Sequence, residues 1–408
     1  METEIIVLKN GLRIVFQPAA FPVSHACILI NAGSRDESNS SFGIAHFIEH
    51  LLFKKTSRRS TSQILNCLEL VGGDLNAFTT KEYTCIHASF LKSHLSKAID
   101  LFADITFNSV FPEKEIEKEK GVVLDELAAY RDTPEEAIAD DFEDFLFQGH
   151  GLGHNILGTT ESVSSFNREK ILNFIQTNYN PANIILGISG QYNLKQVRDL
   201  VEKHFLNLEN KGLLTPRRPP LQHFKSKVLR IQQAVHQTHT ILGGPAFPIS
   251  HKNRLGLALL TNLLGGMAMS SRLNMEIREK KGIAYNIEAY YSPYQDSGLF
   301  SIYFGTDPEK SEKALQLVHK ELKKLREHAI GPVLLTQAKR RFFGQIVLAE
   351  ENRMAVITSM TKSLNDHGYI EHLNELYQKI EDLSAKDLLD IANEVFDPSQ
   401  LSLLKFEP

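Results

Sequence analysis

The 408-residue sequence has no tryptophan and only three cysteines, Cys27, Cys67 and Cys85. Their number is odd and no two form a C-x-x-C pair, which argues against a disulfide framework and against a cysteine-only zinc site. There is also no run of about 18–20 apolar residues that could span a bilayer. The longest candidate, 255–269, is interrupted by polar residues and glycines, so we expect a buried helix there. The N-terminal sequence Met1-Glu2-Thr3-Glu4 has two acidic residues and no basic one, and it runs straight into a strand pattern, unlike a signal peptide. These absences predict a protein of a reducing compartment, most simply the cytoplasm, that does not enter a membrane.

An excess of charge of either sign is also missing. The formal net charge is -4, and 23% of the residues are charged. The signs are mixed along the chain, which predicts no general attraction to nucleic acid or to anionic lipid. Hydrophobic residues make up 42% of the sequence, enough for real cores, and at about 100–200 residues per domain the length predicts two or three domains.

The best candidate for a linker is the segment 209–222, which contains Gly212, Pro216, Pro219 and Pro220 and lacks clear periodicity. Its basic spot, Arg217 and Arg218, is typical of a solvated linker. The segment nearly bisects the chain, so we expect an N-terminal domain at 1–210 and a C-terminal domain at 222–408.

The two halves share one pattern of strands and helices. Each begins with short strand-like runs, continues through helices and an extended pair, and ends near a further strand. At the start, Asn10-Gly11 between two apolar runs predicts a hairpin with a type I′ turn. The repeated pattern predicts an α+β fold of two similar domains, each a mostly antiparallel sheet covered by helices.

The sequence His46-Phe47-Ile48-Glu49-His50 lies within a predicted helix. Residues four apart share one helix face, about 5–6 Å between their Cβ atoms, so His46 and His50 are spaced to bind one zinc ion. Glu49 lies three residues after His46 and faces the same side, where it can deprotonate a water held by the metal. Chance alone yields about 0.07 occurrences of H-x-x-[DE]-H for this composition. The alternative from the residues alone is a surface helix with two histidines and a salt-bridging glutamate.

A catalytic zinc needs a third protein ligand, and Glu126 is the candidate. Glu119 lies two helical turns earlier on the same face and can orient a ligand or a water. Asp125 points about 100° away and is the poorer choice. On pattern alone, this helix can equally be a solvated acidic helix.

Several segments together resemble the pitrilysin/insulinase family of zinc peptidases, the inverzincins, and in particular its short bacterial and mitochondrial-processing-peptidase-like branch. The resemblance spans both halves. It rests on Gly43 to Lys54, Gly72 to Thr79, Glu119, Glu126 at 76 residues after His50, Gly153 to Thr159, Ser271 to Leu273, and the pair Arg278 and Tyr285.

The resemblance implies a zinc metalloendopeptidase with one Zn²⁺ per chain, which acts on unfolded or flexible peptides. Peptide would add as a strand along Asn76, Ala77 and Phe78. Arg278 and Tyr285, in the second half, would bind the substrate carbonyl oxygen.

The resemblance also implies a homodimer with composite active sites, in which the second half of one subunit faces the zinc of the other. The family includes subunits that keep the fold and lose the metal, so a non-catalytic scaffold or partner subunit is the alternative function. A metalloenzyme of another class is a further alternative, although the deaminase signature H-x-E with P-C-x-x-C is absent. His150 and His154 have metal-like spacing, and we interpret them as incidental histidines of a glycine-rich loop.

Overall fold

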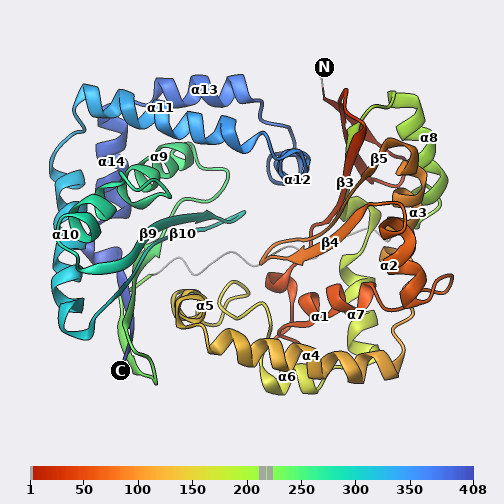
Figure 1. Ribbon diagram of the computed structural model, residues 1–408, viewed down its shortest axis with the longest axis horizontal. Coiled ribbons are helices and arrows are strands. Elements are labelled where there is room, and N and C mark those ends of the chain that lie inside the picture. Colours follow the sequence, from red (N-terminus) through yellow and green to blue (C-terminus); the bar gives the residue numbers. More distant parts are fainter. Residues whose placement is uncertain (1–2, 211–216, 218–223) are drawn as a thin grey trace. The chain divides into compact units, whose positions relative to one another are not determined.

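The computed structural model describes residues 3–210, 217 and 224–408. The expected linker lies outside the described residues except for residues 209, 210 and 217. The chain forms two compact units, whose elements are labelled in Figure 1. In the part of the chain that is described, no helix combines the length and the apolar character needed to cross a membrane.

The two units do not follow the midpoint of the chain. Unit 1 contains the described residues of Met1–Ala128, His154–Arg218 and Ala349–Ile370, and unit 2 contains those of Ala129–Gly153, Pro219–Leu348 and Glu371–Pro408. The boundary between the main parts of the two units lies within the expected linker, 209–222, but each unit also contains one segment from the other half of the chain.

Unit 1 is built on a six-stranded mixed sheet with the order β1-β2-β6-β3-β5-β4. β2 and β6 are parallel and the other neighbours are antiparallel. Among the strands of the described residues, β4 pairs with β5 alone and forms an edge of the sheet. The strands are β1 Glu4–Val7, β2 Arg13–Pro18, β3 Val23–Ile30, β4 Asp74–Thr79, β5 Thr84–Leu91 and β6 Ile184–Gly190.

Unit 2 has a five-stranded sheet with the order β7-β11-β8-β10-β9. β7 and β11 are parallel, and the remaining pairs are antiparallel. The strands are β7 Val228–Gln232, β8 Thr238–Pro245, β9 Ala284–Pro293, β10 Gly298–Thr306 and β11 Ser402–Glu407. Strands β2 to β6 of unit 1 and β7 to β11 of unit 2 have the same order and the same directions, so the predicted fold of two similar α+β domains is confirmed.

The first hairpin forms, but with a different turn from the one predicted. The backbone N–H of Leu8 donates to the oxygen of Leu12 at 2.8 Å, the N–H of Gly11 donates to the oxygen of Leu8 at 2.9 Å, and Gly11 has φ +89°. This is a three-residue loop that places glycine in the left-handed region, in place of the two-residue type I′ turn. The Asn10 side chain donates to the backbone oxygen of Phe205 at 2.7 Å, a long-range contact that the local pattern does not encode.

Helices cover both sheets. Those of unit 1 are α1 Ile44–Leu52, α2 Thr61–Glu69, α3 Leu95–Phe107, α4 Glu113–Arg131, α6 Thr160–Ser164, α7 Arg168–Asn178, α8 Leu194–Phe205 and α12 Arg353–His367. Those of unit 2 are α5 Pro134–Leu146, α9 Arg254–Gly265, α10 Ser311–Glu327, α11 Pro332–Ala349, α13 Leu373–Asp382 and α14 Ala385–Val395. A capping box starts α2, because the Ser60 side chain accepts from the backbone of Gln63 and the Gln63 side chain accepts from the backbone of Ser60.

Each unit contains one helical segment from the other half of the chain, and that helix covers one face of the unit's sheet. α12 packs on β2, β3 and β6 of unit 1, where Ile357 and Leu364 meet Val15 and Ile185 in a separate apolar cluster. α5 packs on β8 and β11 of unit 2, where Phe142 joins another buried cluster. Since a mixed sheet with apolar side chains on both faces must be covered on both, each unit takes one covering helix from the other half of the chain.

Candidate metal centre

Helix α1 carries the H-x-x-E-H sequence and is almost wholly buried. Gly43 at its N-terminus has φ +92°, and a Cβ there would lie 2.4 Å from the backbone oxygen of Leu157, so only glycine fits. The Glu37 carboxylate accepts the backbone N–H groups of Gly43 and Ala45, both at 2.8 Å. A buried carboxyl group thus satisfies two backbone N–H groups at the start of the helix, directly before His46.

The structure brings His46, His50 and Glu126 together. Their potential ligand atoms all lie within 4.8 Å of one another. Oε1 of Glu126 is 3.8 Å from Nε2 of His46, and Oε2 is 3.6 Å from Nε2 of His50. Glu126 comes from α4, so a second helix supplies the third potential ligand.

This arrangement fits a zinc ion. Ligand atoms at about 2.0–2.1 Å from zinc in a tetrahedral set lie about 3.3 Å apart, close to the observed separations. Two imidazole nitrogens and one carboxylate oxygen form a donor set that zinc accepts, and three protein ligands leave a position for water. The Glu126 side chain is 44% exposed, so the open side of the set faces solvent.

Glu119 lies behind His50. Its Oε1 is 2.9 Å from Nδ1 of His50, and its Oε2 is 2.7 Å from Nζ of Lys54. The contact with Nδ1 leaves Nε2 of His50 directed at Glu126, as a metal ligand requires. Burial would raise the pKa of Glu119, but the hydrogen bonds from His50 and Lys54 outweigh it and lower that pKa.

The two histidines have different surroundings. Burial, and then the positive charge of His50, lower the pKa of His46 to about 4, so its ring is neutral and available as a ligand. Burial also lowers the pKa of His50, but the hydrogen bond to Glu119 and the charges of Glu126, Glu119 and Glu49 outweigh it and raise that pKa.

Glu49 is buried beside the two histidines. Burial raises the pKa of its carboxyl group, and the hydrogen bond from Thr79 opposes that rise. The Thr79 hydroxyl is 2.6 Å from Oε2 of Glu49. Thr79 is the last residue of the segment Gly72 to Thr79 that carries part of the family resemblance, but the sequence pattern predicted no role for it.

His154 is more than an incidental loop histidine, which corrects the interpretation from sequence. It is buried, its Nε2 is 2.9 Å from Oε2 of Glu37, and its ring stacks on Phe42 at 4.0 Å. His150 belongs to unit 2 and His154 to unit 1, so the two histidines do not act as a pair. The segment around His154 was recognised by resemblance, but its contact with Glu37 was not anticipated.

The three predicted peptide-binding residues lie on the edge strand β4. Asn76 is exposed, while Ala77 and Phe78 are half-buried. Oδ1 of Asn76 accepts the backbone N–H of Ala77 at 2.8 Å. The Phe78 ring lies 6.0 Å from the rings of Tyr83 and His87.

Arg278 and Tyr285 belong to unit 2, and the metal ligands belong to unit 1. Arg278 is exposed on the π-helical segment η4 Asn274–Glu279. Tyr285 is exposed on β9, and its hydroxyl donates to Oδ1 of Asp307 at 2.8 Å.

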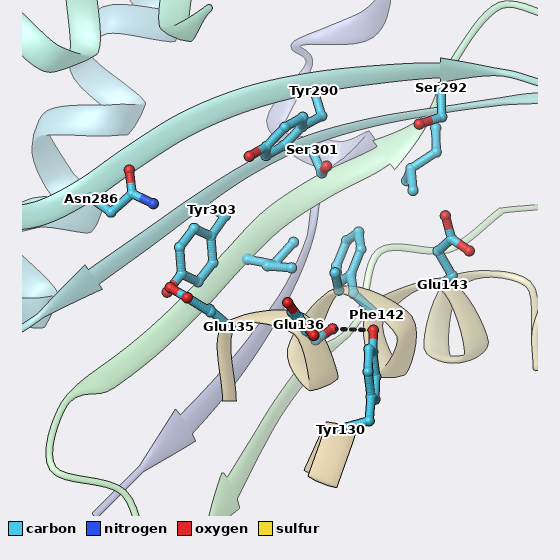
Figure 2. A pocket seen from close by; sticks show the side chains of 13 residues that line it. Tyr130, Glu135, Glu136, Phe142, Glu143, Asn286, Tyr290, Ser292, Ser301 and Tyr303 are labelled. Carbon is cyan, nitrogen blue, oxygen red and sulfur yellow. Dashed lines mark hydrogen bonds between the residues drawn. The ribbon is translucent and has the colours of Figure 1, made fainter. Parts of the chain in front are cut away.

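A cavity of about 510 Å³ lies within unit 2, between α5 and the sheet. Figure 2 shows the side chains around it, which include Tyr130, Glu135, Glu136, Glu143, Asn286, Tyr290, Ser292, Ser301 and Tyr303. Several polar groups already have partners: the Tyr130 hydroxyl donates to the backbone oxygen of Glu136 at 2.9 Å, and that of Tyr303 lies 2.9 Å from Nδ1 of His239. None of the residues predicted from sequence lines this cavity.

The sequence matches two family models that together cover most of the chain. Residues 14–160 match the model described as Insulinase (Peptidase family M16), and residues 165–342 match the model described as Peptidase M16 inactive domain. The first match contains the H-x-x-E-H sequence and Glu126.

Similar proteins align over nearly the whole chain. An uncharacterised zinc protease of Bacillus subtilis is 33% identical over 390 residues, which cover 95% of this chain and 94% of that protein. An uncharacterised zinc protease of Streptomyces coelicolor is 32% identical over 402 residues, with 95% and 86% covered.

Solved structures have the same fold. The crystal structure of a protease from Helicobacter pylori superposes with a TM-score of 0.95 at 26% identity and covers 100% of both chains. A Pseudomonas fluorescens structure described as a peptidase M16 inactive domain has a TM-score of 0.93 at 18% identity, covering 100% of this chain and 98% of that one.

Proposed function

Because the chain belongs to the insulinase family of peptidases, family M16, we propose that it is a zinc metalloendopeptidase that hydrolyses unfolded or flexible peptides. The observation that carries the proposal is the convergence of His46, His50 and Glu126 beside the buried carboxylate of Glu49. A metal-ligand set with an adjacent general base is the arrangement that hydrolysis of a peptide bond requires.

His46, His50 and Glu126 would hold one zinc ion. When bound, zinc lowers the pKa of a coordinated water towards neutrality and polarises the scissile carbonyl. Glu49 takes the proton of the attacking water at its carboxylate and returns it to the leaving amine. Glu119 keeps the His50 ring oriented through Nδ1.

Peptide would add to β4 by main-chain hydrogen bonds. β4 pairs with β5 on one side only, so its other edge offers unpaired backbone groups. Asn76, Ala77 and Phe78 would contact the added strand. Strand addition requires an extended segment, which favours flexible peptides over compact folded domains.

We also propose a homodimer in which Arg278 and Tyr285 of the partner subunit bind the substrate carbonyl oxygen near the zinc. This chain carries both the zinc ligands and the Arg/Tyr pair, which favours self-association over an obligate different subunit. The three cysteines are unpaired, which supports a reducing compartment such as the cytoplasm.

The alternative is a non-catalytic member of the family. The matching relatives are named uncharacterised zinc proteases, and one family model carries the word inactive. The presence of all four side chains of the zinc centre favours catalysis.

A single digestion experiment tests the proposal. The purified protein is incubated with a library of unstructured peptides of graded lengths and with a stably folded protein, each with and without chelator, and zinc per chain is measured. We expect one zinc per chain and chelator-sensitive cleavage of the peptides alone. A protein that holds zinc and cleaves no peptide would support the non-catalytic alternative.

A further inference from the structure

We propose that Thr79 is a positioning residue for Glu49, and that it links the general base to the strand that receives the substrate. This inference rests on the proposed function, because it assigns Thr79 a part in the same reaction. Thr79 lies at the C-terminal end of β4, 30 residues after Glu49 in the sequence.

The contact itself leaves one oxygen of the base available. The Thr79 hydroxyl donates to Oε2 of Glu49 at 2.6 Å. Within the described part of the chain, no other hydrogen bond to this carboxylate is present. A single donor on Oε2 fixes the orientation of the carboxylate and leaves Oε1 to take the proton of the attacking water.

A threonine hydroxyl suits this role. It is a neutral donor, so it orients the carboxylate without the loss of basicity that a neighbouring lysine or arginine would cause. Threonine is β-branched and restricted at χ1, so little conformational freedom remains for the hydroxyl to turn away. Thr79 is also half-buried, which limits competition from solvent.

The chain directly after Thr79 is held in place. The backbone N–H of Thr80 donates to the oxygen of Tyr83 at 2.9 Å, and the N–H of Ser34 donates to the oxygen of Thr80 at 3.1 Å. Gly33 packs so closely that an added Cβ would lie 2.3 Å from the oxygen of Thr80. The hydroxyl of Thr79 is therefore presented from a fixed backbone, as a preorganised supporting contact requires.

The same strand offers the free edge. Asn76 and Ala77 lie three and two residues before Thr79 on β4, and the Asn76 side chain accepts the backbone N–H of Ala77. A peptide that adds to this edge replaces that local contact with main-chain hydrogen bonds along β4. The Thr79 hydroxyl contacts Glu49 and not the backbone groups of this edge, so its loss should lower turnover and leave the affinity for peptide unchanged.

Three variants separate this role from a general structural one. Thr79→Val removes the donor with little change in shape, and Thr79→Ser restores it. Thr84→Val is the matched control, because Thr84 pairs with Thr79 across the hairpin and its hydroxyl donates to the backbone oxygen of Ala32 at 3.0 Å. Each variant is purified with zinc, and zinc per chain, kcat and KM for one unstructured peptide, and a crystal structure are obtained.

We expect all three variants to retain one zinc per chain. For Thr79→Val we expect kcat to fall about tenfold or more, which is a smaller loss than the roughly 10²–10⁴-fold fall that removal of a general base causes. The KM should stay within about twofold of the wild-type value. Thr79→Ser and Thr84→Val should keep kcat near that of the wild type. In crystals of Thr79→Val, the Glu49 carboxylate should have turned from its position beside the histidines.

Loss of zinc in Thr79→Val, an unchanged kcat, or an equal fall of kcat in Thr79→Ser would overturn the inference. If the wild type holds zinc and cleaves no peptide, the proposed function fails. The crystal structures then test whether Thr79 positions Glu49. A Glu49 carboxylate that stays in place without the Thr79 hydroxyl then contradicts the inference, and one that turns away only in Thr79→Val supports it.

Discussion

Nε2 of His154 lies 2.9 Å from Oε2 of Glu37, at the N-terminus of the helix that carries the two histidines of the metal centre. Glu37 also accepts the backbone N–H groups of Gly43 and Ala45. One buried carboxylate thus joins the segment around His154 to the first turn of α1, directly before His46.

This buried carboxylate makes stability depend on pH. Burial raises the pKa of Glu37 well above its usual value. Between the unfolded pKa of about 4.3 and the raised folded pKa, the native state binds the extra proton, so stability falls as pH rises. We expect the stability of the wild type relative to Glu37→Gln to decrease by up to about 1.4 kcal/mol per pH unit in that window.

The measurement is chemical denaturation of both proteins, stripped of metal, at several pH values from 5 to 8. The quantity compared is the difference between their free energies of unfolding at each pH. Groups common to both cancel in the difference. A flat difference would show that Glu37 has the same pKa in the folded protein and in the unfolded chain, and a difference that grows with pH would show that its folded pKa is lowered. Either result would contradict the prediction.

Metal binding and chemistry should separate at Glu126 and Glu49. Glu126→Ala removes an oxygen ligand, so zinc per chain should fall together with activity. Glu49→Gln keeps the shape and the hydrogen-bonding oxygen but cannot accept a proton, so zinc should stay near one per chain while kcat falls about 10²–10⁴-fold. Metal analysis and peptide kinetics on the same preparations check this, with Asp125→Asn as the control on the same helix. Equal loss of zinc from both glutamate variants would contradict the separate roles.

A composite active site should be restored by mixing two inactive proteins. In Glu49→Gln protein Arg278 is intact, and in Arg278→Ala protein Glu49 is intact. A mixed dimer has one site with an intact zinc centre and an intact Arg278 of the partner subunit, so activity should return to about a quarter of the wild-type level after random exchange. The assay is peptide hydrolysis after subunit exchange, monitored by native mass spectrometry. Demonstrated exchange with no recovery would rule out the arrangement in trans.

The exchanged helices should make the two halves of the chain depend on each other. A fragment of residues 1–210 lacks α12 and exposes Val15 and Ile185, and a fragment of residues 224–408 lacks α5. Each fragment alone should aggregate or remain partly unfolded, because a sheet face loses its apolar cover. Co-expression should recover a soluble complex. Far-UV circular dichroism and size-exclusion chromatography report the outcome, and two fragments that fold independently would count against a structural role for the exchange.

The sequence by itself determined the features that rest on local spacing. His46, Glu49 and His50 share a helix face because they are three and four residues apart, and Ser60 caps α2 because Gln63 follows at the capping-box spacing. The repeated order of strands and helices predicted two similar α+β domains, and the family resemblance is confirmed by full-length relatives.

The tertiary structure alone decided the contacts between segments far apart in the chain. Periodicity reports which face of a helix or strand is apolar, but not which distant element packs against it. The contact of Thr79 with Glu49 was therefore not predicted, although Thr79 lies in a segment that carries the family resemblance, and His154 was taken for an incidental loop residue. The exchange of α5 and α12 was likewise hidden, because each helix covers a sheet of the other half and the pattern of its own half gives no sign of that partner. The oxygens of Glu126 lie 3.6 and 3.8 Å from the two imidazoles because α4 packs beside α1, and only the folded chain fixes that distance.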